Sequence, residues 1–160
     1  MSRARLKQIP GIEKSPYIGA LLRLAHEEAR SRTLQALAER GLGDINQAHY
    51  RLFQYPPIDG MRPADLAKRL GVSKQALNHL LGQLEKLRYL QRRHEQGKGH
   101  TAVYFTERGW LVLESTIATM RQLEADWQRK LGKRRFADLK EALRKLTGLS
   151  DGSTASPDST

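Results

Sequence analysis

The 160-residue chain contains no cysteine, which excludes disulfides, thiolate metal sites and cysteine-based redox sensing. It also lacks any run of about 18 apolar residues, so the sequence predicts no membrane span and no membrane partner. The first residues, MSRARLKQIPG, lack the apolar segment of a signal peptide. With 39% hydrophobic residues the chain can bury one core, and we expect a single cytoplasmic domain.

Common sequence signatures of enzymes and metal sites are missing as well. There is no G-x-S-x-G, P-loop or G-x-G-x-x-G motif, and Gly97-Lys98-Gly99 is too short to cradle a phosphate by itself. The five histidines have no metal-ligand spacing and stand on separate predicted elements: His26, His49, His79, His94 and His100. We therefore predict no enzymatic activity, no cofactor and no metal site.

What the chain does have is positive charge. It carries 28 Lys and Arg against 17 Asp and Glu, a formal net charge of +11 with a pI of about 10.3. Between Arg62 and Arg108 there are ten basic and four acidic residues, so over half of the net charge lies in this stretch. Such a balance indicates a polyanionic partner, nucleic acid before membrane.

The stretch from Pro63 to Gly82, PADLAKRLGVSKQALNHLLG, predicts two short helices joined by a tight turn. Pro63 suits the first turn of a helix, because its missing N–H has no intrahelical partner there. Gly71 stands where the backbone must reverse, and Ser73 can accept a backbone N–H as N-cap of the second helix. Apolar residues then recur at helical spacing, which predicts a face turned toward a core: Leu77, Leu80, Leu81, Leu84 and Leu87.

Polar side chains occupy the other face of the second predicted helix: Lys74, Gln75, Asn78, His79 and Gln83. Lysine, glutamine and asparagine reach phosphates and base edges in a major groove, so this face indicates a helix-turn-helix that binds double-stranded DNA. The alternative is an ordinary helical hairpin with a solvated polar face.

A basic β-hairpin is predicted directly after the second helix. The apolar period changes beyond Leu87, and two short strands joined by the Gly97–Gly99 turn account for the alternation around Val103 and Phe105. A basic hairpin in this place is typical of a wing. We predict DNA contacts from this motif as a whole: Arg62, Ser73, Lys74, Gln75, Asn78, His79, Arg92, Arg93, Lys98 and His100.

The remaining segments are predicted to be helices and two chain ends. Residues 1–16 form a basic arm that either contacts phosphates or only solubilises the chain. Amphipathic helices are expected from Tyr17 to about Arg40, from Glu107 to about Leu131 and over residues 134–146. Asp44 is expected to cap a shorter helix over residues 45–55, and residues 150–160 are expected to be disordered.

The order of these elements, with three particular segments, resembles the MarR family of bacterial transcriptional regulators over residues 17–146. The segments are YIGALLRLAHEEARSRTLQALAERGL, DLAKRLGVSKQALNHLLGQLEKLRYLQRR and VYFTERG. The resemblance implies a mainly α fold with a small β-hairpin wing, in one domain over residues 17–149. Residues 44–106 would form the winged helix-turn-helix lobe, and residues 17–43 and 107–149 the dimerisation helices. It also implies a homodimer on a pseudo-palindromic operator.

The predicted wing departs from the family pattern at its tip. The family wing often carries an aspartate and an arginine two residues apart, and this chain has EQGKGHTAV instead. Lys98 or His100 is the candidate to replace that arginine in the minor groove. The departure concerns wing contacts and leaves the expected fold unchanged.

Dimerisation also follows from the apolar stripes of the long helices, which exceed what one small lobe can cover. The alternative is that these helices fold back as a monomeric cap. Family members often bind small aromatic compounds, and four aromatic residues either line such an effector pocket or belong to the core: Tyr50, Phe53, Trp110 and Trp127.

Two functional classes remain open from the sequence. The first is a sequence-specific transcriptional regulator that acts by occupying an operator. The second is an architectural or accessory DNA-binding protein with little sequence preference, which the high charge would suit. A module that uses the motif for protein contacts alone is disfavoured, because the centre of a protein-binding face is usually depleted in charge.

Overall fold

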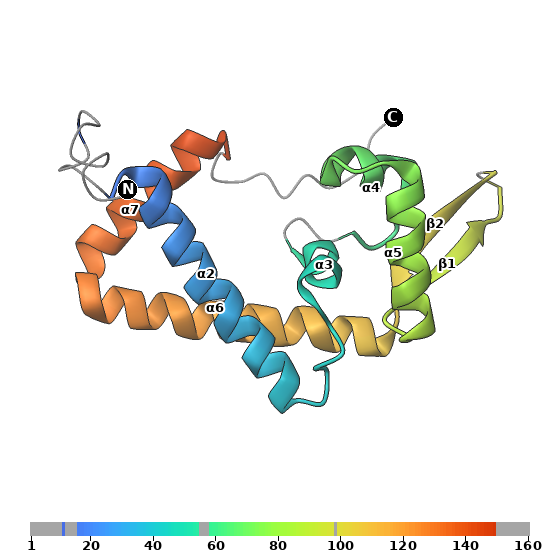
Figure 1. Cartoon of the computed structure of the whole chain (residues 1–160), viewed down its shortest axis with the longest axis horizontal. Helices are drawn as coiled ribbons and strands as arrows, with labels where there is room; N and C mark the ends of the chain where they lie inside the picture. The colour runs from blue at the N-terminus through green and yellow to red at the C-terminus, as the bar shows by residue number, and fades with distance from the viewer. Residues whose placement is uncertain (1–10, 12–15, 55–57, 98, 150–160) are drawn as a thin grey trace, which may run out of the picture. The chain divides into compact units, whose positions relative to one another are not determined.

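The computed structural model describes residue 11 and residues 16–54, 58–97 and 99–149. The chain is mainly helical with one two-stranded hairpin, as predicted (Figure 1). It forms two compact units, one up to Thr119 and one from Met120, which are described separately. Apart from residues 11 and 16, the predicted basic arm and the predicted C-terminal tail lie outside the described residues.

The first unit begins with the long helix α2, Ile18–Glu39, followed by the short helix α3, Gln47–Tyr50, and a 3-10 turn η2, Arg51–Phe53. The prediction that Asp44 caps the short helix is wrong. Asn46 is the N-cap, because its side chain accepts the backbone N–H of His49 at 2.9 Å while the His49 ring accepts the backbone N–H of Asn46. Asp44 instead accepts hydrogen bonds from Tyr89 and Arg108.

The helix-turn-helix consists of α4, Pro63–Leu70, and α5, Lys74–Lys86. Gly71 ends α4 in the left-handed conformation, with φ 63° and ψ 35°, which glycine adopts without steric cost. The Ser73 hydroxyl accepts the backbone N–H of Ala76 at 3.1 Å and so caps α5. Both features confirm the predicted turn chemistry.

The core of the first unit lies beneath the helix-turn-helix. Leu66, Leu77, Leu81 and Leu84 bury the inner faces of α4 and α5, and Phe53 stacks on Phe105 with the ring centroids 5.2 Å apart. This core covers one face of α5 and leaves the polar face in solvent.

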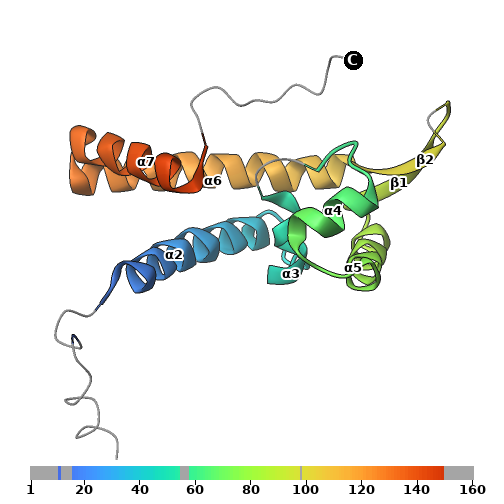
Figure 2. The ribbon, with the colours of Figure 1, turned by 90° about the horizontal axis from the view of Figure 1, so that it is seen from above.

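The wing is the antiparallel pair β1, Leu90–Glu95, and β2, His100–Phe105, with Arg92 opposite Val103 and Arg93 opposite Ala102. Both ribbon views show it projecting away from α4 and α5 (Figures 1 and 2). Its base is tied to the loop before α4, since Met61 forms a β-bridge with Val103 and Asp59 accepts the backbone N–H of Phe105 at 2.7 Å.

A second set of contacts joins the base of the wing to α6, Glu107–Leu131. The Thr106 hydroxyl accepts the backbone N–H of Gly109 at 3.2 Å, as expected of an N-cap. A Cβ at Gly109 would lie 2.2 Å from the carbonyl oxygen of Tyr89, so this close approach requires glycine. Arg108 pairs with Asp44 at 2.9 Å and lies over the Tyr89 ring.

The second unit contains the end of α6 and the helix α7, Lys133–Thr147. Leu123 and Phe136 are buried in it, and Lys140 pairs with Glu124 at 2.9 Å. Leu139 and Leu146 remain exposed on α7. Within the described ranges, no helix combines the length and hydropathy required to cross a bilayer.

Candidate nucleic-acid interface

Four predicted DNA-contacting side chains lie together on the solvent face of α5: Lys74, Gln75, Asn78 and His79. Helical periodicity places Gln75 and His79 on one line and Asn78 beside them. Ser73 stands at the N-terminus of the same helix, where free backbone N–H groups and the helix dipole favour an anion. This face therefore combines a phosphate-binding end with hydrogen-bonding side chains.

Arg62 lies just before α4, at its N-cap position, and is exposed. Its Nε donates to Asp65 at 2.8 Å, within the first turn of α4. An exposed ion pair of this kind contributes little energy and exchanges readily, so Arg62 keeps its donors accessible to a phosphate.

Arg92 makes hydrogen bonds within the protein that the sequence does not indicate. Its guanidinium donates to both carboxylate oxygens of Glu85, at 2.6 and 3.0 Å, and the same carboxylate accepts the Arg92 backbone N–H. This hydrogen bonding raises the pKa of Arg92 further above its ordinary value. Nη1 also lies 3.5 Å from the Asn78 amide oxygen, so Arg92 joins the wing to α5.

Arg93 lies on the other face of the wing. Its guanidinium is 5.4 Å from the centroid of the Tyr104 ring, and the Tyr104 hydroxyl donates to Glu95. That hydrogen bond raises the pKa of Tyr104. His100 is half-buried opposite Glu95. Lys98 lies outside the described residues.

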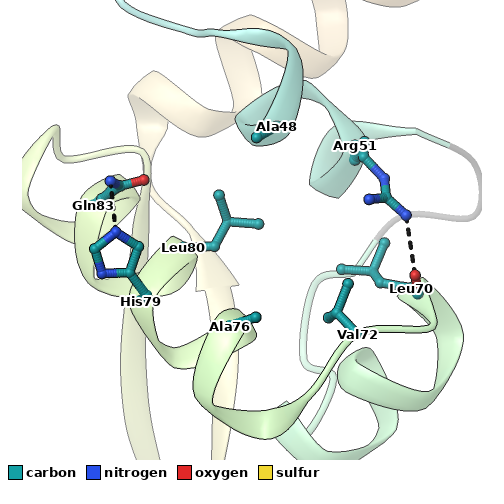
Figure 3. A pocket seen from close by; sticks show the side chains of 8 residues that line it. All are labelled: Ala48, Arg51, Leu70, Val72, Ala76, His79, Leu80 and Gln83. Carbon is teal, nitrogen blue, oxygen red and sulfur yellow. Dashed lines mark hydrogen bonds between the residues drawn. The ribbon is translucent and has the colours of Figure 1, made fainter.

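A hollow of about 260 Å³ lies behind the solvent face of α5 (Figure 3). Its walls are mainly aliphatic, from Ala48, Leu70, Val72, Ala76 and Leu80, and its rim carries Arg51, His79 and Gln83. Arg51 donates to the carbonyl oxygen of Leu70 at 3.0 Å and closes one side. The hollow thus borders the helix that carries the predicted base-reading residues.

Residues outside the predicted site connect to it: Gln83 and Glu85 directly, and His49 through Gln83. The Gln83 amide oxygen accepts from His49 Nε2 at 3.1 Å, and the Gln83 amide nitrogen donates to His79 Nε2 at 3.0 Å. Glu85 holds Arg92. The Asn46-x-x-His49 spacing is a capping pattern that a sequence search could have found. No local rule relates Glu85 to Arg92, because they pair across two elements.

The predicted effector residues divide between core and surface. Tyr50 and Phe53 are buried core residues, whereas Trp110 is partly exposed and meets Phe105 edge-on at 5.1 Å. Trp127 lies in the second unit. A metal site has no candidate among the described residues, where no three His, Asp or Glu side chains gather.

Comparison with known proteins gives a consistent result. Residues 56–99, which contain the helix-turn-helix and most of the wing, match the model of the MarR family. No curated protein sequence matches the chain. Among solved structures, the S. aureus MepR–DNA complex is similar with 21% identity, 84% of this chain and 97% of that chain covered, and a TM-score of 0.61.

Two further solved structures show the same likeness. The oxidised form of MarR from E. coli has 20% identity, covers 82% of this chain and 94% of its own, and has a TM-score of 0.63. The transcriptional regulator Tm0710 from Thermotoga maritima has 23% identity, covers 82% of this chain and 92% of its own, and has a TM-score of 0.56. At these identities the likeness establishes the fold. The chain thus shares the winged helix-turn-helix fold of these structures, and its residues 56–99 are similar to the MarR family.

Proposed function

We propose that the protein is a transcriptional regulator that binds a pseudo-palindromic operator as a homodimer, with α5 of each chain in the major groove. One observation carries the proposal: the exposed face of α5 presents Lys74, Gln75, Asn78 and His79 together, beside a basic wing. A similar structure, MepR, is a complex with DNA. The proposal makes α5 the base-reading element and gives the protein no enzymatic role.

The proposed phosphate contacts surround α5. Ser73 and Lys74 bind a phosphate at its N-terminus, and Arg62 binds one beside α4. Arg93, Lys98 and His100 act on the wing. Arg92 reaches a phosphate only by using Nη1 or by releasing Glu85, so its contribution is smaller than that of an uncommitted arginine.

The proposed dimer is supported by where apolar surface remains exposed. Large apolar side chains are exposed at the start of α2, on α6 and on α7, for example Ile18, Leu24, Ile117 and Leu146. A monomer seldom leaves so many large apolar side chains in solvent, so these helices favour a partner surface. Pairing of residues 17–43 and 107–149 around a two-fold axis would cover them and set the two α5 helices about 34 Å apart.

The proposed function is tested by selecting DNA from a random-sequence pool and footprinting the selected site with competitor DNA present. A regulator enriches one motif with two related half-sites and protects it at a fixed spacing. Binding should also weaken steeply with salt, with a slope of about −0.9 per neutralised phosphate. No enrichment, or affinity that barely changes with salt, would contradict the proposal.

The net charge of +11 favours a second candidate, an architectural DNA-binding protein with little sequence preference. The same selection separates the two, since an architectural protein binds the starting pool about as tightly as the selected DNA. If the regulator is confirmed, a cytoplasmic location follows from the location of bacterial DNA. Small aromatic compounds can then be tested for release of the selected operator, as the family resemblance implies.

A further inference from the structure

A directed chain of hydrogen bonds runs from the α3 N-cap to the solvent face of α5. It joins the backbone N–H of Asn46 to His49 Nδ1 at 3.4 Å, His49 Nε2 to Gln83 Oε1 at 3.1 Å, and Gln83 Nε2 to His79 Nε2 at 3.0 Å. Figure 3 shows its last link, between Gln83 and His79 at the rim of the hollow. Every member except His79 is a residue to which the proposed function assigns no role.

The first donor fixes the direction of the whole chain. A backbone N–H can only donate, so His49 Nδ1 must accept and carries no proton. The neutral His49 ring then has its proton on Nε2 and donates to the oxygen of Gln83. That oxygen orients the Gln83 amide, whose nitrogen donates to His79 Nε2.

His79 is therefore held in one tautomer. Its Nε2 accepts from Gln83, so the proton of the neutral ring resides on Nδ1. In Figure 3 this second ring nitrogen points away from the hollow. Within the described residues, His79 Nδ1 has no hydrogen-bond partner, so α5 presents it outward as a donor.

Burial of His49 makes this arrangement costly to reverse. His49 is only 4% exposed, and turning the Gln83 amide over would place its N–H₂ against the Nε2–H of that ring. Relief would require the other His49 tautomer, which loses the bond from Asn46 that closes the α3 cap. A buried donor without an acceptor is disfavoured, so His49 keeps Gln83 in place.

We propose that His79 reads a guanine in the operator through Nδ1–H, and that Gln83, backed by His49, is the positioning residue that makes it a donor. Guanine presents two acceptors in the major groove, N7 and O6, whereas adenine presents an acceptor and a donor. A fixed N–H donor thus fits guanine and opposes the adenine N6–H₂. The inference rests on the proposed function and assigns one base within that operator.

The tautomer is tested first, in the free protein, by ¹⁵N chemical shifts of the histidine rings at a pH where they are neutral. Wild type should show His79 protonated at Nδ1. Gln83→Leu removes the donor, and His79 should change toward the Nε2–H form that imidazole favours in water. Gln83→Glu replaces the donor with an acceptor and should move the proton to Nε2. Wild-type His79 protonated at Nε2 would overturn the inference.

The matched control for the glutamate variant is Lys86→Gln, which makes the same change in net charge on α5 without touching the histidines. It should leave the His79 tautomer unchanged. Folding of each variant is checked by its thermal unfolding, and the ring shifts of His49 report whether the α3 cap is intact.

Base reading is tested on the DNA selected by wild type, with each guanine replaced in turn by 7-deazaguanine, which lacks N7, or by adenine, which lacks O6. One guanine in each half-site should show a loss of about three- to tenfold per hydrogen bond for wild type and for Lys86→Gln. For His79→Ala, Gln83→Leu and Gln83→Glu, the same replacement should reduce DNA affinity only slightly, because these variants already lack the donor.

The outcomes separate this inference from the proposed function. If no DNA sequence is enriched, the proposed function fails, whatever the His79 tautomer. If a site is enriched but every guanine replacement weakens His79→Ala as much as wild type, the inference is wrong while the proposed function stands. If a neutral methylphosphonate at one phosphate weakens wild type but not His79→Ala, His79 binds that phosphate and the proposed base reading is wrong.

Discussion

The winged helix-turn-helix lobe, residues 44–106, and the terminal helices differ in how many large apolar side chains they leave exposed. Between residues 44 and 106, the described part of the chain leaves no large apolar side chain exposed. At the start of α2, along α6 and on α7, exposed residues include Ile18, Leu111 and Leu146. A lobe that satisfies its own core can stand alone, whereas terminal helices with open apolar faces require another surface. In the proposed function, the lobe would bind DNA and the terminal helices would form the dimer.

The largest effect is expected from disrupting the proposed dimer interface of the terminal helices while leaving the lobe intact. Leu146 is 79% exposed, so Leu146→Asp should not disturb the second unit by itself. In the proposed interface an unpaired charge costs several kcal/mol, so this variant should be monomeric and lose operator affinity. Ultracentrifugation and operator titration measure both effects. Ala137→Asp, on the opposite face of α7 by helical periodicity, is the control and should remain dimeric.

A second test disrupts the close contact between α6 and the base of the wing. Gly109→Ala would place a Cβ 2.2 Å from the Tyr89 carbonyl oxygen and against Phe105, so we expect a loss of about 3 kcal/mol in the free energy of unfolding. Gly82→Ala is the matched control, because a Cβ there meets nothing within 4 Å inside α5 and should stabilise by about 1 kcal/mol. Urea unfolding of both variants measures the contrast. Equal changes in the free energy of unfolding would mean that the contact between Gly109 and Tyr89 tolerates a side chain.

The third test sharpens the assignment of base reading to the polar face of the lobe. Gln75→Ala or Asn78→Ala should cost about 1–3 kcal/mol on the selected operator and much less on random DNA. Arg93→Ala should weaken both DNAs about equally, because a phosphate contact carries little sequence information. Titrations on the two DNAs distinguish these patterns. Equal losses for Gln75→Ala would make that residue a backbone contact.

The smallest expected effect is a dependence on pH inside the lobe. Burial, with the Asp44 hydrogen bond and charge, raises the pKa of Tyr89 from 10.0 to about 12. The unfolded chain releases this proton near pH 10 while the folded chain keeps it. Stability present below pH 10 is therefore lost as the pH rises from 10 to about 12. Tyr89→Phe should cost about 1 kcal/mol at neutral pH and remove this part of the alkaline loss, measured by urea unfolding.

Local sequence rules predicted most of the fold. Pro63, Gly71 and Ser73 each act through their own backbone or the next turn, and all three have the predicted roles at the helix-turn-helix. The wing was predictable from its glycine turn and its change of period. The exception is Asp44, which was predicted as a cap because it precedes a helix. Its carboxylate binds Tyr89 and Arg108, residues 45 and 64 positions away.

The candidate site was less predictable because its geometry depends on contacts between elements. The exposed polar face of α5 follows from helical periodicity, so Gln75 and Asn78 could be placed from the sequence. The pairing of Arg92 with Glu85 could not, since counting charges does not show which of them are already neutralised. The link from His49 through Gln83 to His79 likewise spans α3 and α5.

The bridge between Met61 and Val103 would lower the entropy cost of the proposed DNA binding. It adds a third backbone segment to the base of the wing, and Asp59 holds the end of β2 from the same loop. Ordering a free loop on binding costs about 1–2 kcal/mol per residue in conformational entropy. Residues 58–61 and 100–105 are already ordered in the free chain, so their backbone would not have this cost in the proposed complex. Because the base of the wing is already ordered, less of the free energy of each proposed phosphate contact would be spent on ordering the backbone.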